Sequence, residues 1–208
     1  MSLFITFEGG EGCGKSVQAR ALFEHLREMG VSALLTHEPG GTPLGERITR
    51  TLKWTHHTAI SPLTELLLFN ASRSQLVAEV IKPALQEGKV VVCDRYADST
   101  TAYQSYGRGL DIKLVKAINN AGTQGFMPDL TVLLDIPPET GLARKSRRKP
   151  DRFEQETLDF HRRVRHGYLV LAATGPRRWL VIDATQSRAQ IRHIIWKRVA
   201  RLLPRQGA

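Results

Sequence analysis

A glycine-rich stretch near the start of the chain has the residue types and spacing that suit phosphate binding. It reads Gly9-Gly10-Glu11-Gly12-Cys13-Gly14-Lys15-Ser16 and matches the pattern G-x-x-x-x-G-K-[S/T]. Glycines let consecutive backbone N–H groups turn toward phosphate oxygens, and the following helix adds its N-terminal dipole. We expect Lys15 to reach the β- and γ-phosphates and the Ser16 hydroxyl to bind Mg²⁺. The stretch from Gly9 to Val17 is therefore predicted to bind a nucleoside triphosphate.

This loop does not identify the phosphate acceptor, because P-loops serve ATPases, GTPases and kinases. A GTPase would carry an N-K-x-D-type element for base recognition, which is absent from the sequence. A helicase or other motor would usually need more than 208 residues. The acceptor must be sought elsewhere in the chain.

Three further stretches place polar and aromatic residues where an acceptor could bind. The segment 37–42, His-Glu-Pro-Gly-Gly-Thr, predicts a tight turn after a strand, at the sheet edge where ligands bind in open α/β folds. Asp94 and Arg95 end another buried strand, where Asp94 suits the Mg²⁺ shell and Arg95 can hold a phosphate bidentately. Phe69 and Arg73 lie one helical turn apart, so an aromatic plane and a forked donor could hold a flat base.

The P-loop contains Glu11 but no arginine ahead of Lys15, so a cation for the transferred phosphoryl group must come from elsewhere. A mobile arginine of this kind contributes about 10³–10⁵ in rate in related P-loop systems. The basic segment at about 142–153 is the predicted supplier and would act as a short lid. The candidate cations are Arg144, Arg148 and Arg152, and their spacing does not choose among them.

Composition indicates one globular domain spanning 1–208, with 41% hydrophobic and 24% charged residues. No signal peptide or transmembrane helix is expected, and two cysteines are too few for a disulfide framework, which favours the cytoplasm. The formal net charge of +10 could indicate nucleic acid or an anionic membrane. Positive residues instead gather at 144–152 and 188–205, without interleaved aromatics, so nucleic-acid binding is not favoured and no membrane partner is expected.

Apolar runs alternate with helical patterns along the chain, which predicts a doubly wound α/β fold with a five-stranded parallel sheet flanked by helices. The predicted strands are 3–7, 33–36, 90–93, 130–134 and 179–182. The predicted helices are 15–29, 62–86 with a kink at Pro83, 111–121, 138–147, 154–172 and 187–203.

Five motifs in the expected order resemble those of bacterial thymidylate kinases, over residues 4 to 186. They are Phe-Glu-Gly-Gly-Glu-Gly-x-Gly-Lys-Ser, Glu-Pro-Gly-Gly-Thr, Phe-Asn-Ala-Ser-Arg, Asp-Arg-Tyr-x-x-Ser-x-x-Ala-Tyr-Gln and Asp-Arg-Phe-Glu. The resemblance implies a P-loop nucleoside monophosphate kinase that transfers the ATP γ-phosphate to dTMP, giving dTDP, with Mg²⁺ and as a homodimer. Two departures stand out: Cys13, where alanine or serine is usual, and a Lys149-Pro150 pair in the lid.

The resemblance also assigns roles around the acceptor. Phe69 would stack on thymine, Arg73 would bond its carbonyl edge and Thr100 its N3 side. Tyr103 would crowd the 2′ position of the sugar, and Arg95 would hold the acceptor phosphate. Further substrate-binding residues implied at this site are Glu38, Pro39, Ser99 and Gln104.

At the donor side, the resemblance places Glu11 near the acceptor 3′-hydroxyl and the metal-water shell. Thr185 and Gln186 would border adenine. Two other functions stay open: a P-loop kinase for another pyrimidine nucleotide or deoxynucleotide, and a nucleic-acid-stimulated ATPase.

Overall fold

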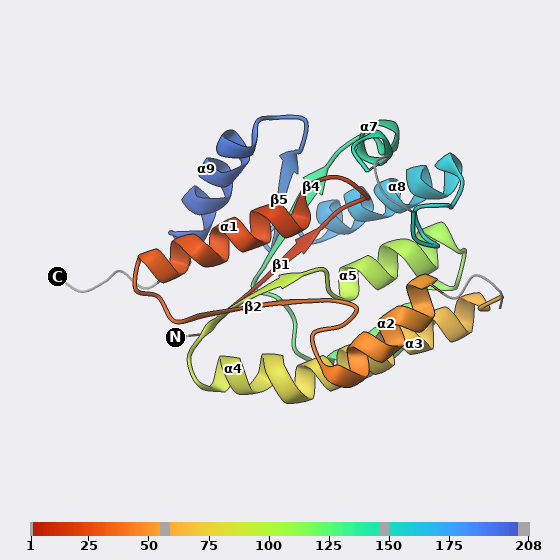
Figure 1. Ribbon diagram of the computed structural model, residues 1–208, viewed down its shortest axis with the longest axis horizontal. Helices are drawn as coiled ribbons and strands as arrows, with labels where there is room; N and C mark the ends of the chain where they lie inside the picture. Colours follow the sequence, from red (N-terminus) through yellow and green to blue (C-terminus); the bar gives the residue numbers. More distant parts are fainter. Residues whose placement is uncertain (1, 55–58, 146–149, 204–208) are drawn as a thin grey trace.

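A parallel sheet of five strands forms the centre of the protein, in a computed structural model that describes residues 2–54, 59–145 and 150–203 (Figure 1). The strand order is β2-β3-β1-β4-β5, and every neighbouring pair is parallel. The strands are β1 (Leu3–Glu8), β2 (Ala33–His37), β3 (Val90–Asp94), β4 (Leu130–Asp135) and β5 (Trp179–Asp183). The predicted fold class is confirmed, and each predicted strand is present with its C-terminal end one residue further on.

Helical segments connect these strands. They are α1 (Lys15–Glu28), α2 (Pro43–Trp54), α3 (Pro62–Leu76), η1 (Val77–Ile81), α4 (Lys82–Gln86), α5 (Ala97–Thr100), η2 (Thr101–Gly107), α6 (Ile112–Thr123), α7 (Pro138–Ala143), α8 (Leu158–Thr174) and α9 (Arg188–Val199). No helix within these ranges is long and apolar enough to cross a bilayer.

The helices differ from the prediction at several places, among them α7, which ends at Ala143 rather than at 147, and α8, which begins at Leu158 rather than at 154. Helix α2 was not predicted, and neither was the helical run of α5 and η2 that follows β3, where β-branched and aromatic residues disfavour a helix. The long predicted helix 62–86 is present, but it contains the π-helical turn η1, which ends two residues before Pro83. Proline has no N–H to continue the α-helical ladder, so a wider turn at this point is physically reasonable.

Alternate residues of β1 face opposite sides of the sheet, as strand geometry requires. Leu3, Ile5 and Phe7 pack in one apolar cluster with α1 and α9, which lie on the same side of the sheet (Figure 1). Phe4 packs on the other side, in a cluster with η1 and β3. Both faces of β1 are therefore covered by apolar clusters.

Helix α7 lies in direct backbone contact with the P-loop. Gly12 has a positive φ of 68°, and a Cβ built on it would lie 1.9 Å from the Gly141 carbonyl oxygen. A Cβ on Gly141 would in turn lie 2.2 Å from the Glu11 carbonyl oxygen. Only glycine fits at this crossing, which joins the start of the predicted lid to the phosphate loop.

Candidate functional site

The P-loop connects β1 to α1 and has Lys15 at the first position of the helix. The Lys15 ammonium donates to the carbonyl oxygens of Gly9 at 3.1 Å and Gly10 at 2.7 Å, and lies 3.4 Å from the Cys13 sulfur. Lys15 is 7% exposed. A buried cation inside a glycine-rich loop at a helix N-terminus fits a phosphate-binding site.

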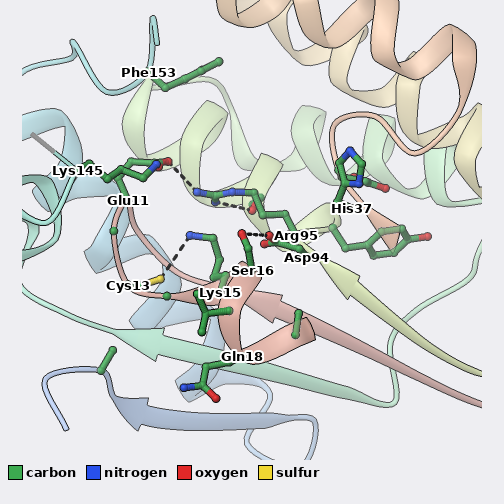
Figure 2. A pocket seen from close by; sticks show the side chains of 18 of the residues that line it. Glu11, Cys13, Lys15, Ser16, Gln18, His37, Asp94, Arg95, Lys145 and Phe153 are labelled. Carbon is green, nitrogen blue, oxygen red and sulfur yellow. Dashed lines mark hydrogen bonds and ion pairs between the residues drawn. The ribbon is translucent and has the colours of Figure 1, made fainter. Parts of the chain in front are cut away.

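Ser16 and Asp94 meet at the start of α1, where the Ser16 hydroxyl donates to Asp94 Oδ2 (Figure 2). The other oxygen, Asp94 Oδ1, is buried and has no hydrogen-bond partner among the described residues. Mg²⁺ at kinase sites uses one or two protein oxygens and takes its remaining ligands from phosphates and water. The pair fits such an ion, whereas the described residues contain no cluster of three metal-binding side chains.

Arg95 connects the P-loop to the acceptor side of the site. It follows β3 with a positive φ of 73°, and its backbone N–H donates to Phe7 O at 2.9 Å. One guanidinium nitrogen, Nη2, donates to Glu11 at 2.7 Å and to the Tyr103 hydroxyl at 3.3 Å. The other, Nη1, donates to Gly9 O at 3.2 Å and Ser99 Oγ at 3.1 Å.

Glu11 has cations on both sides, because Lys145 also donates to it, through Glu11 Oε2 (Figure 2). Burial alone would raise the pKa of the Glu11 carboxyl, but Arg95, Lys15 and Lys145 together hold this pKa well below its usual range. Glu11 is therefore ionised at neutral pH. The Lys145 ammonium also pairs with Glu154, and these two carboxylates raise its pKa against the effect of burial.

One cavity of about 1280 Å³ contains both the phosphate loop and the predicted acceptor residues. Phe69 is half-buried in its wall and lies 5.7 Å from the Phe153 ring, centroid to centroid. Predicted site residues that line the cavity are Glu11, Gly12, Cys13, Gly14, Lys15, Ser16, Val17, Glu38, Pro39, Phe69, Arg73, Asp94, Arg95, Ser99, Thr100, Tyr103, Gln104, Arg144 and Gln186. The donor and acceptor motifs, far apart in sequence, therefore share one space.

Arg73 holds the acceptor wall together from a position that is only 1% exposed. Its guanidinium donates to Thr100 Oγ1 at 2.7 Å and to Glu38 Oε2 at 2.8 Å. The remaining Glu38 oxygen and the Gln104 side-chain oxygen are buried without a hydrogen-bond partner among the described residues. Unpaired buried oxygens are costly, and here they lie on residues that line the cavity, as expected where a ligand supplies donors.

The three lid candidates lie apart. Arg152 donates to Glu65 Oε2 at 2.6 Å and to Leu52 O at 2.9 Å, and it does not line the cavity. Arg144 lines the cavity and donates to Ala184 O at 3.1 Å, beside the predicted adenine border. Arg148 lies outside the described residues. Thr185 bonds Asp183 and does not line the cavity, whereas Gln186 does.

Several residues of this site carry no sequence motif that marks them. Lys145 belongs to the predicted basic segment, but nothing in the spacing separated it from the neighbouring arginines. Tyr168, on α8, donates to Glu8 at 3.1 Å and accepts from Arg95 at 3.2 Å, and no local motif marks it. Glu65 is fully buried and binds Gln104, Arg108 and Arg152. An acid at a buried helix position was the available signal for Glu65.

A glycine-rich loop between a central strand and its helix, facing an acceptor wall across one cavity, defines a P-loop protein of the nucleoside monophosphate kinase type. A family model described as thymidylate kinase matches residues 7–195. The chain is 57% identical over 203 residues to the thymidylate kinase of Dehalococcoides mccartyi (strain CBDB1), which covers 98% of each chain. The chain belongs to the thymidylate kinase family.

Two further relatives agree. The thymidylate kinase of Deinococcus radiodurans is 51% identical over 199 residues, which covers 95% of this chain and 96% of the relative. The crystal structure of thymidylate kinase from Ehrlichia chaffeensis has a TM-score of 0.77 to this chain, at 34% identity. That comparison covers 97% of this chain and 99% of the solved chain.

Glu8 lies close to Arg95 and is fully buried. Its two oxygens accept from Tyr96 N at 2.8 Å, Ser99 Oγ at 2.5 Å and the Tyr168 hydroxyl at 3.1 Å. Burial and the nearby Asp98 raise the pKa of the Glu8 carboxyl to about 7, against the lowering effect of Ser99 and Arg95. Glu8 thus remains protonated in the folded protein at pH values where it ionises in the unfolded chain.

This raised pKa predicts a pH-dependent stability that Glu8→Gln removes. Between the ordinary value of 4.5 and about 7, the native state holds one proton more than the unfolded state. Stability should therefore fall as pH rises through this window. The difference in unfolding free energy, wild type minus Glu8→Gln, should fall by about 3 kcal/mol from about pH 5 to about pH 8.

Urea unfolding of both proteins at the two pH values measures this difference. Groups other than Glu8 titrate in both proteins, so their contributions largely cancel. A difference that stays constant with pH would show that Glu8 ionises normally in the folded state.

Proposed function

We propose that this protein transfers the γ-phosphate of ATP to dTMP, giving dTDP for the synthesis of dTTP. The observation that carries the proposal is Arg95, whose guanidinium touches Glu11 of the P-loop and Tyr103 of the acceptor wall in one cavity. A cation between a donor and an acceptor site favours transfer from phosphate to phosphate over hydrolysis. Family membership favours dTMP as the acceptor over another pyrimidine nucleotide, and favours a kinase over a nucleic-acid-stimulated ATPase.

In this proposal the donor side is built by the P-loop. Its backbone N–H groups and Lys15 bind the β- and γ-phosphates, and Gln186 borders the adenine. Ser16 and Asp94 would hold Mg²⁺, which would supply positive charge against that of the phosphates. Arg95 orients the acceptor phosphate toward the donor.

The acceptor side recognises the base and the sugar of the nucleoside. Phe69 stacks on the thymine, while Arg73 and Thr100 bond its polar edge, from positions that their mutual hydrogen bond already fixes. Tyr103 lies where a ribose 2′-hydroxyl would need space, and its hydroxyl donates to Glu11 at 2.8 Å. That bond holds the ring in place before the substrate binds. The exclusion of ribonucleotides therefore costs little additional ordering of the Tyr103 side chain.

A coupled assay with ATP, Mg²⁺ and a panel of nucleoside monophosphates tests the proposal. We expect dTMP to have the highest kcat/KM, above dUMP, dCMP and AMP, because only thymine fills the pocket that Phe69 and Arg73 form. Preference for another pyrimidine nucleotide would keep the kinase and reject its assigned substrate. ATP hydrolysis that responds only to nucleic acid would reject the kinase itself.

The lid cation can be assigned by a paired substitution. Lys145 touches the P-loop residue Glu11, whereas Arg152 is bound to Glu65 and Leu52 O. We therefore expect Lys145→Met to lower kcat by about 100-fold with a small change in KM for dTMP, because the lost interaction forms in the transition state. Arg152→Ala should instead lower the unfolding temperature, since it leaves the buried Glu65 short of a partner.

The alternative, that Arg152 supplies the catalytic charge, predicts the reverse ranking of the two kcat values. Arg144→Ala is the third variant of the series. Loss of ATP affinity alone in that variant would fit its position beside Ala184.

We also propose a homodimer in the cytoplasm. Leu63 and Leu67 lie one turn apart on α3 and are 43% and 49% exposed, an apolar strip that a second copy could cover. Both cysteines are buried and free, so the fold needs no oxidising compartment. Sedimentation velocity would test the dimer: wild type should sediment as a dimer and Leu67→Glu as a monomer, and an unchanged state would exclude this strip.

A further inference from the structure

Lys53 lies in the wall of the same cavity, although no motif of the sequence marks it. It stands in the last turn of α2, a helix that the sequence pattern did not reveal. Two hydrogen bonds fix this end of α2 to the far end of the predicted lid: Arg152 N donates to Lys53 O at 3.2 Å, and the side-chain Arg152 Nε donates to Leu52 O at 2.9 Å. The position of Lys53 is therefore built into the fold.

The Lys53 ammonium has no hydrogen bond or ion pair with any residue in the described ranges 2–54, 59–145 and 150–203. Burial lowers the pKa of this ammonium, and among its charged neighbours Asp151 and Glu11 raise it while Arg95 and Lys145 lower it. A half-buried cation next to two other cations is unfavourable by itself. A phosphate dianion between these cations would offset that cost.

The surroundings of Lys53 point to the acceptor phosphate rather than the donor phosphates. Helix α2 packs against α3, which carries the base-binding residues Phe69 and Arg73. The charged neighbours of Lys53 include Arg95, the residue predicted to hold the acceptor phosphate. Lys53 thus belongs to the side of the cavity where the acceptor enters.

We propose that Lys53 binds the 5′-phosphate of the acceptor nucleotide together with Arg95. The inference rests on the proposed function, since it needs a nucleoside monophosphate in this cavity. Arg95 would contact the phosphate from the P-loop side and Lys53 from the end of α2, so the monoester is held between them. Lys53 then contributes to the affinity for the phosphate and not to that for the nucleoside.

Calorimetric binding of dTMP and of thymidine to the same proteins isolates this contribution. Lys53→Met removes the charge and keeps most of the stem, and Lys53→Arg restores a cation. We expect Lys53→Met to weaken dTMP binding by about 10- to 100-fold, the range for a hydrogen bond to a charged group, and to leave thymidine binding unchanged. Lys53→Arg should recover most of the loss.

Steady-state kinetics adds a second readout. In Lys53→Met the KM for dTMP should rise and the KM for ATP should stay within about two-fold, because the donor phosphates are bound by the P-loop. Lys116→Met, on the exposed face of α6, is the matched control for removing one positive charge, and it should change neither value.

Three results would overturn the proposal. If Lys53→Met weakens the binding of thymidine and of dTMP equally, Lys53 supports the position of α2. If only the KM for ATP rises, Lys53 acts at the donor site. If nothing changes, Lys53 is a surface charge. Failure of the proposed function is seen separately, in the wild type, as preference for another monophosphate or for none. In the first of those cases, the same comparison of nucleoside and nucleotide is made with the accepted pair.

Discussion

The guanidinium of Arg95 is held in place by the pairing of β1 with β3, and the two halves of the site meet at this group. The residue adopts a left-handed backbone conformation at the end of β3, which costs about 1–3 kcal/mol for a side chain other than glycine. Two contacts from β1 oppose that cost, Phe7 O on the Arg95 amide and Glu8 on the next amide, Tyr96 N. A shift in the β1–β3 register would therefore move the cation away from the P-loop.

Buried carboxylates organise the cations around this centre. Glu11 lies between Arg95 and Lys145, and Glu38 holds Arg73. Glu65 forms ion pairs with both Arg108 and Arg152. Each pair costs desolvation, so such ion pairs are weak evidence for stability, but each fixes the direction of a donor. The proposed binding groups are thereby oriented before any ligand arrives, and less ordering would remain to be done when it does.

The sequence contained most of this arrangement where chemistry and local structure coincide. Lys15 and Ser16 must follow a strand and open a helix for the loop to work, so their pattern also predicts their structure. Phe69 and Arg73 could be paired because a helix brings i and i+4 together. Lys53 and Tyr168 could not be found this way, because only the tertiary packing of α2 and α8 brings Lys53 to the cavity and Tyr168 to Arg95. The spacing could not choose among Arg144, Arg148 and Arg152 and did not mark Lys145 for the same reason, since a basic segment does not show which carboxylate each cation meets.

The two ends of the predicted lid are fixed in different ways, and this difference bears on which cation can reach a phosphate. At one end, Gly141 lies against the P-loop backbone, so the chain leaves the loop within a few residues of Lys145. At the other end, Arg152 is tied to α2 and to the buried Glu65. A cation close to the first end needs only a short displacement from Glu11 to a γ-phosphate bound by the same loop. A cation at the second end would first have to give up a buried carboxylate, whose desolvation would then be uncompensated. The geometry thus favours a lysine beside the P-loop as the substitute for the arginine that the loop lacks.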